Sequence, residues 1–185
     1  MQGIDAPEIG QRCESNTGRW QCGKEAADAM LALVTNREVV CEEREKDQYG
    51  RVIATCRVGE IDLGVALVAQ GLAWAFRRFS TIYVTTEDTA RKQALGIWAA
   101  TNQPAWEFRS ERWQAAINAT PREGCPIKGN ISQNGRIYHT PWSPWYNRTI
   151  ISESKGERWF CDELEAVQAG WCASIGRRGG QQAQA

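Results

Sequence analysis

The sequence predicts an α+β protein of two units: a small β-barrel that carries helices, and a smaller unit rich in turns. Hydrophobic residues make up 42% of the 185 residues and charged residues 24%, a globular composition with enough apolar mass for a core. Runs of strand character alternate with runs of helical periodicity up to about residue 100. Beyond that point, prolines and tryptophans stand among charged residues, which indicates a connector and a second unit.

Three stretches of the first unit predict its strands. Residues 3–8 read GIDAPE, which is typical of a strand end that runs into a proline-fixed turn. Residues 37–42 and 51–58 are rich in β-formers and are joined by a polar segment, so we expect a hairpin. Residues 72–76 form a further short strand.

Three helices are expected between and after these strands. Residues 24–35 repeat apolar side chains at spacings of three and four, and Asn36 is a suitable residue to end that helix. Asp62 is a good N-cap for a short helix that ends at Gly71. Another helix opens at residues 85–88. Four apolar residues lie on one stripe of this helix: Ala90, Ala94, Ile97 and Trp98.

The second unit has its own turns and its own capped helix. Residues 101–123 are predicted to be a partly helical connector. A strand at 136–139 and another at 159–161 follow, and Asp162 with Glu165 forms a capping box for a helix. We place the first domain at residues 1–109, a linker at 110–123 and the second domain at 124–175, with residues 176–185 as a disordered tail.

Charge and cysteine content restrict the class of protein. Twenty-two basic residues balance 22 acidic ones, so the net charge does not indicate a nucleic-acid binder. No run approaches the roughly 18 apolar residues of a membrane span. Seven cysteines accompany one histidine without any C-x-x-C pair, which favours disulfides in an exported protein over a zinc site or buried thiols. The first residues contain no secretory signal, so we expect the natural chain to begin further upstream.

Two clusters are candidates for chemistry. Asp5 and Glu8 lie three residues apart around Pro7, a spacing at which a turn can aim both carboxylates into one pocket; the alternative is a pair of solvated turn residues. Arg51 begins a strand after a glycine turn, where it either clamps a phosphate or is an ordinary hairpin arginine.

These clusters belong to a longer pattern. Four motifs, in this order along the chain, resemble the thermonuclease (staphylococcal-nuclease-like) family. They are residues 3–8 (GIDAPE), 49–54 (YGRVIA), 67–73 (LVAQGLA) and 87–98, the last with Glu, Ala-Arg and Gly-Ile-Trp in order. The resemblance covers residues 3–109, over half the chain. It implies an OB-type barrel with three helices and Ca²⁺-dependent hydrolysis of phosphodiester bonds in DNA and RNA.

The resemblance also implies roles for four residues. Asp5 matches a calcium ligand, and Ala6 stands where a backbone carbonyl ligates the metal. Glu8 matches the proposed general base, and Arg51 matches the arginine that stabilises the pentacovalent phosphate. The family's upstream Asp-Gly-Asp-Thr segment and a second arginine have no counterpart in the printed sequence. We therefore expect a barrel incomplete at its N-terminus and half of the catalytic set.

Exported relatives of this family imply how the cysteines pair. One bridge would close the loop before the first helix, and one would tie the hairpin. In the second unit we pair Cys125 with Cys161, which leaves Cys172 over. The pairs are Cys13–Cys22, Cys41–Cys56 and Cys125–Cys161.

The second unit resembles the small "sunset" domain, which is often attached to exported nucleases, at residues 125–131, 137–139 and 157–161. Trp142, Trp145 and Tyr146 either stack on bases or sugars or, as we favour, pack a small core. His139 is a weak candidate for a metal ligand.

The sequence thus predicts a periplasmic or extracellular, monomeric nuclease that acts on DNA or RNA with Ca²⁺. Two rival functions stay open. One is a non-catalytic OB-type module that binds nucleic acid or another polymer, and the other is a secreted interaction protein whose units are scaffolds.

Overall fold

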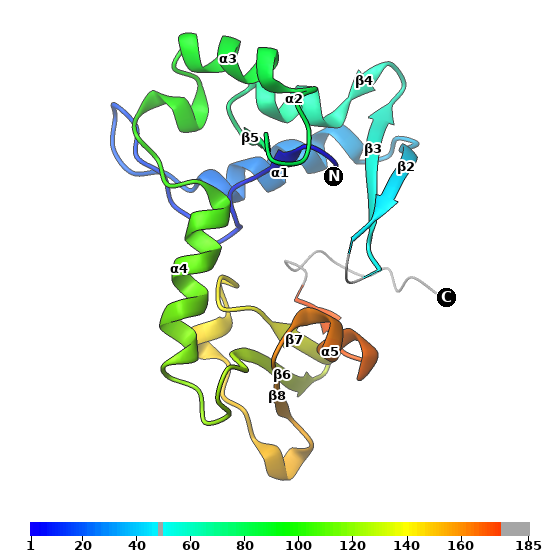
Figure 1. The fold of residues 1–185 in the computed structure, drawn as a ribbon, viewed down its shortest axis with the longest axis vertical. Helices are drawn as coiled ribbons and strands as arrows, with labels where there is room; N and C mark the ends of the chain where they lie inside the picture. Colours follow the sequence, from blue (N-terminus) through cyan, green and yellow to red (C-terminus); the bar gives the residue numbers. More distant parts are fainter. Residues whose placement is uncertain (48–49, 175–185) are drawn as a thin grey trace.

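The computed structural model describes residues 1–47 and 50–174, which form two units joined by one helix. Figure 1 shows helix α4 (Ala105–Ile117) running from the first unit to the second. Strands β2 (Val40–Lys46) and β3 (Val52–Val58) also extend from the first unit toward the second.

The strands of the first unit lie in two open sheets. β1 (Ile4–Asp5) pairs antiparallel with β5 (Trp74–Ala75), and β2 (Val40–Lys46), β3 (Val52–Val58) and β4 (Ile61–Asp62) form the second sheet in that order. The predicted strand-to-turn segment and hairpin are therefore present. The described strands do not close into a barrel.

The helices of the first unit begin and end largely where the sequence predicts. α1 (Cys22–Val34) is followed by Asn36 in the left-handed conformation, with φ 56°, and α2 (Leu63–Ala69) is capped by the Asp62 side chain, which accepts from the Val65 amide. Because Asn adopts left-handed backbone more readily than most residues, it suits this helix stop.

The third helix is shorter than its predicted stripe. α3 (Val84–Lys92) ends before Ala94, which has φ 51°, and Ile97 and Trp98 lie in the separate turn η1 (Gly96–Ala99). A close backbone contact explains this break: the Ile97 amide donates to the Gly71 carbonyl at 2.9 Å. Ala90 and Ile97 are buried as a core-facing stripe requires, whereas Ala94 is exposed, and the prediction of one continuous helix was wrong.

The second unit is a four-stranded sheet with a short helix beside it. The order of strands across the sheet is β8 (Arg158–Phe160), β6 (Ile127–Ser132), β7 (Gly135–His139) and β9 (Cys172–Ala173). The helix α5 (Glu163–Gln168) is capped by Asp162. Two 3₁₀ turns, η2 (Tyr146–Arg148) and η3 (Glu153–Lys155), lie in the connection between β7 and β8.

Helix α4 is anchored in both units. Ala105, in its first turn, is buried in the core cluster that contains Trp74 and Ile97. Trp113, two turns later, packs against the core of the second unit. The predicted connector is therefore helical over 13 residues. The domain boundaries, which place residues 110–123 in a linker, remain a prediction.

All three predicted disulfides are present, and Cys172 is free and exposed. The predicted tail at 176–185 lies outside the described residues. Within 1–47 and 50–174, no helix has the length and apolar character needed to span a bilayer.

Candidate active site

Backbone pairing fixes the position of Asp5, and a buried glutamine fixes the loop that carries Glu8. Asp5 is the last residue of β1 and lies opposite Trp74 of β5. After Pro7, the Glu8 amide donates to the Gln11 side chain, and the Gln11 amide donates to the Glu8 carbonyl at 2.7 Å. Gln11 is only 3% exposed and donates in turn to the carbonyl of Gln103, just before α4. The loop is therefore fastened to the segment that leads into α4.

The two acidic side chains meet at a residue that the sequence analysis did not select. Arg109 of α4 donates from Nη1 and Nη2 to Oδ1 and Oδ2 of Asp5, at 3.0 and 2.7 Å. The same Nη1 donates to Oε1 of Glu8 at 2.9 Å. One guanidinium thus holds Asp5 in the bidentate geometry for which arginine is suited, and holds Glu8 through a single hydrogen bond.

Burial makes the charges of this cluster strongly interdependent. The side chain of Asp5 is 12% exposed, that of Glu8 25% and that of Arg109 27%. Burial raises the pKa of Glu8 above its ordinary value, and the hydrogen bond and charge of Arg109 offset part of that rise. Burial alone would lower the pKa of Arg109, but the hydrogen bonds and charges of Asp5 and Glu8 outweigh it and raise that pKa.

Arg51 lies on the hairpin and forms a different set of ion pairs. Its Nε donates to Oδ2 of Asp47 at 2.7 Å, and its Nη1 is 3.6 Å from Oε1 of Glu163, the first residue of α5. The hydroxyl of Tyr138 donates to the other oxygen of Glu163 at 2.9 Å. Glu163 of the second unit therefore faces Arg51, the candidate phosphate-binding residue of the first unit.

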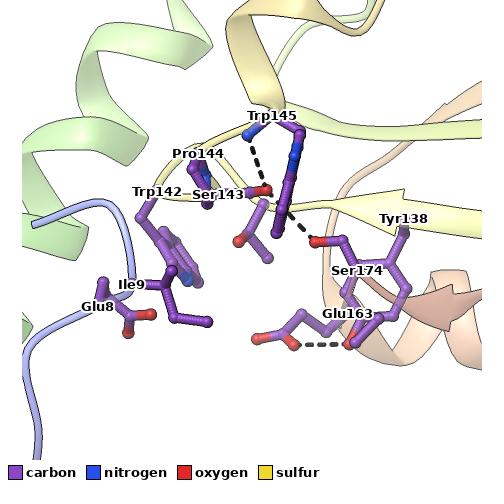
Figure 2. Close-up of a pocket in the computed structure, with 11 residues that line it drawn as sticks. Glu8, Ile9, Tyr138, Trp142, Ser143, Pro144, Trp145, Glu163 and Ser174 are labelled. Carbon is purple, nitrogen blue, oxygen red and sulfur yellow. Dashed lines mark hydrogen bonds between the residues drawn. The ribbon is translucent and has the colours of Figure 1, made fainter. Parts of the chain in front are cut away.

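A cavity of about 160 Å³ lies between the Glu8 loop and the second unit. Figure 2 shows Glu8 and Ile9 on one side of it and Tyr138 and Glu163 on the other. The rest of its lining consists of aromatic, small and hydroxyl-bearing residues of the second unit: Thr140, Trp142, Ser143, Pro144, Trp145, Ala173 and Ser174.

Among the residues that the structure describes, the acidic side chains near Asp5 and Glu8 are too few to hold a divalent cation. No group of three or more His, Cys, Asp or Glu side chains is placed to hold a metal ion within 1–47 and 50–174. Asp5 and Glu8 instead share the guanidinium of Arg109, and hard cations usually require several oxygen ligands. The acidic side chains of the described residues therefore do not form a calcium site in this arrangement.

The structure brings some predicted site residues together and adds others. Asp5 and Glu8 converge as their spacing predicts, whereas the ion pairs described for Arg51 join it to Asp47 and Glu163. Trp142 and Trp145 line the cavity. Tyr146 is buried and donates to the Pro126 carbonyl, as expected of a core residue. His139 hydrogen-bonds to Asn130 at 3.0 Å.

Sequence reasoning missed Arg109, although the sequence contains a signal for it. On α4, the positions three and four residues away from Arg109 hold Ala105, Trp106, Arg112 and Trp113. Arg109 thus has no acidic partner on its own helix and lies on an apolar stripe, so a partner elsewhere in the fold was required. Glu163 and Tyr138 carried no comparable signal.

Comparison with known protein families gives two matches along the chain. Residues 1–100 match the model of the family described as "Staphylococcal nuclease homologue", and residues 112–173 match a model named ArfC. The second match corrects the expectation of a sunset-like domain, which rested on three short runs of residues.

Named relatives match somewhat less than two thirds of the chain. A micrococcal nuclease of Shigella flexneri is 32% identical over 132 residues, which is 63% of this chain and 68% of that protein. An uncharacterised endonuclease of Haemophilus influenzae is 28% identical over 119 residues, covering 62% of each chain. A probable staphylococcal-like nuclease of rice, CAN4, is 29% identical over 119 residues, 63% of this chain but 22% of that protein.

The chain thus spans less than two thirds of the rice and Haemophilus proteins, while its family match covers residues 1–100 of 185. The arrangement of β1, its acidic turn and the hairpin agrees with that match. The chain belongs to the staphylococcal nuclease homologue family.

Proposed function

We propose that this chain carries the hydrolytic site of a nuclease that cleaves phosphodiester bonds in DNA or RNA. The observation that supports it most is the convergence of Asp5 and Glu8 on one guanidinium at the edge of a cavity. Two solvated turn carboxylates, the alternative interpretation, would not share a partly buried partner that lies 104 and 101 residues away from them in the chain.

Glu8 is suited to act as the general base. A carboxylate of ordinary pKa is a weak base at neutral pH, and burial moves the pKa of Glu8 upward, toward the range in which proton transfer is efficient. Its position on the cavity wall gives a water molecule access to the carboxylate. Glu8 would therefore orient and deprotonate the water that attacks phosphorus.

Arg51 is suited to stabilise the charge that develops on the phosphate. An arginine contributes most when it binds the transition state more tightly than the substrate, and its planar fork fits phosphate oxygens. Its longer ion pair, 3.6 Å to Glu163, is the one that a substrate phosphate would replace.

The cofactor that we propose is Ca²⁺, on the strength of the family resemblance, with Asp5 and the Ala6 carbonyl as the ligands that this chain would supply. In the present arrangement the acidic side chains do not fit the ion, so no step of the reaction is assigned to it. We further propose a periplasmic or extracellular location and a monomeric state; the three disulfides support the location.

Cleavage of a fluorescent single-stranded oligonucleotide in the presence of calcium tests the proposal. Glu8→Gln should lower turnover by roughly 10²–10⁴-fold, and Arg51→Ala by roughly 10²–10³-fold. The matched controls are Glu38→Gln, at an exposed glutamate, and Arg57→Ala, on the strand that begins directly after Arg51; both should cleave like the parent. Equal cleavage by all five proteins would contradict the proposed roles.

A second candidate, a non-catalytic nucleic-acid-binding module, is favoured by another feature. A cavity of about 630 Å³ lies near α3, η1 and the start of α4 and combines aromatic with basic side chains. These are Trp74, Phe76, Arg77, Arg78, Arg91, Trp98 and Trp106. Phe76 and Trp106 stack at 5.1 Å between ring centroids. Bases can stack on such surfaces beside arginines.

The two functions predict different results for Arg78→Ala. If this cavity binds single-stranded DNA, the substitution should weaken oligonucleotide binding measured in chelator, whereas Arg37→Ala, at an exposed arginine before β2, should not. Binding without any cleavage in calcium would favour the module over the nuclease.

A further inference from the structure

We propose that the guanidinium of Arg109 occupies the cation position of the Asp5–Glu8 pair, and that a divalent cation must displace it to bind there. Arg109 would then set the metal affinity of the candidate site. This inference rests on the proposed function, because it concerns the same carboxylates. It assigns a role to a helix that follows the family match at residues 1–100.

The geometry shows how the guanidinium satisfies both acids. Both carboxylate oxygens of Asp5 accept from Arg109, as does one oxygen of Glu8. The side chains of the cluster are mostly shielded from water, so the positive charge of Arg109 acts at short range with little screening. A dication placed on these oxygens would face that charge within a few ångströms.

The position of Arg109 is determined by the fold rather than by chance surface contact. Ala105, one turn before it, is buried in the core of the first unit, and Trp113, one turn after it, packs on the core of the second. The helix between these two anchors holds the arginine over the acidic turn. Its release would therefore require a change of side-chain rotamer or a movement of α4.

Competition has a defined thermodynamic consequence. If the metal binds only when Arg109 has left the carboxylates, the apparent affinity is the intrinsic affinity multiplied by the fraction of molecules in which Arg109 is released. Removing the guanidinium should raise the apparent affinity. The opposite role, in which Arg109 preorganises the carboxylates for the metal, predicts that removing it weakens binding.

Terbium binding, followed by tryptophan-sensitised luminescence, separates the two roles without reference to cleavage. Terbium is a hard cation that takes oxygen ligands as calcium does, and calcium competition supplies the calcium affinity. Arg109→Met removes the charge and keeps much of the apolar stem. We expect it to bind terbium and calcium at least about tenfold more tightly than the parent.

Two further variants make the comparison specific. Arg112→Met removes an arginine from the same helix, one that contacts Phe108 rather than the acids, and should leave the affinity unchanged. Asp5→Asn introduced into Arg109→Met should abolish the gain. Unchanged or weaker binding by a folded Arg109→Met, or no terbium binding by it at all, would overturn the proposal.

A measurement on the parent protein covers the case in which Arg109→Met does not fold. Phenylglyoxal modifies accessible guanidinium groups, and mass mapping reports the labelling of each arginine. Rising calcium should increase the labelling of Arg109 and not that of Arg112. Labelling of Arg109 that calcium leaves unchanged or lowers would count against displacement.

Failure of the nuclease proposal gives a different result. If no variant cleaves DNA but Arg109→Met binds terbium more tightly, the inference stands and the catalytic function does not. If the protein cleaves DNA but Arg109→Met leaves its metal affinity unchanged, the catalytic function stands and the inference does not.

Discussion

Arg109 donates from two nitrogens to both carboxylate oxygens of Asp5, at 3.0 and 2.7 Å, although 104 residues separate them in the chain. The contact joins the last residue of β1 to the middle of α4, and so fastens the acidic turn to the helix that both units share. Stability and the candidate chemistry therefore depend on the same three side chains.

The first prediction concerns the free energy of this contact. Asp5→Ala should lower the free energy of unfolding by about 1–3 kcal/mol, because it leaves a partly buried guanidinium with one acidic partner fewer. The double variant with Arg109→Met should lose less than the sum of the two single losses, since neither charge is then left alone. Urea unfolding of the four proteins measures this, and strictly additive losses would show that the two residues are not coupled.

Much of the fold was predictable because its signals are local. Asp62 and Asp162 act as helix N-caps, and Asn36 follows the end of α1, as their residue types suggest. The antiparallel hairpin follows from two β-rich runs around a polar segment. In each case residues close in sequence determine the structure.

The parts that sequence reasoning missed depend on contacts between distant segments. The end of α3 follows from the packing of Gly71 against the backbone at 95–96, which periodicity within the helix does not reveal. The ion pair between Arg51 and Glu163 joins the two units. Such pairs are set by topology, so an alternating or helical pattern gives no sign of them.

The second prediction follows from the pKa of Glu8. Burial raises this pKa in the folded protein, so the folded state holds its proton to higher pH than the unfolded state does. Stability linked to Glu8 should therefore be fully present below the unfolded-state pKa, near 4.5, and be lost as pH rises through the higher folded-state pKa.

Glu8→Gln removes this titration while keeping an oxygen that can accept from Arg109. The parent should lose stability relative to Glu8→Gln as pH rises across that window, and the difference should level off above it. Thermal unfolding of both proteins from acid to neutral pH measures the effect. A difference that is constant with pH would mean that folding does not shift the pKa of Glu8.

The third prediction concerns a close approach beneath the acidic turn. A Cβ atom at Gly23, in the first turn of α1, would lie 1.6 Å from the carbonyl oxygen of Glu8. Gly23→Ala should therefore displace the turn and destabilise the protein by about 1–3 kcal/mol, the usual cost of overpacking a core. Gly10→Ala is the control in the same loop, because its nearest atom would be at 3.4 Å. Equal melting temperatures for both variants would contradict the described packing.

The fourth prediction ranks two disulfides by burial. Cys13 and Cys22 are 1% and 0% exposed, within the core cluster of Trp74, whereas Cys41 is exposed on the hairpin. Because thiol–disulfide exchange requires access to a sulfur, mild reductant should open Cys41–Cys56 first. Timed alkylation with mass mapping of each cysteine reads out the order. Earlier labelling of Cys13 and Cys22 would reverse it.

The last prediction locates the flexible connection between the two units. Helix α4 orders residues up to Ile117, so cleavage of the native protein should fall beyond it, in the largely exposed segment at 118–124. The endoproteinase Glu-C should cut after Glu123 and spare Glu111, which is exposed but hydrogen-bonded within the helix. A protease needs several residues of extended backbone, and a packed helix supplies them only by local unfolding. Arg109→Met should increase cleavage after Glu111, because the helix then loses its attachment to Asp5 and Glu8. Rapid cleavage after Glu111 in the parent would show that α4 is not held between the two units.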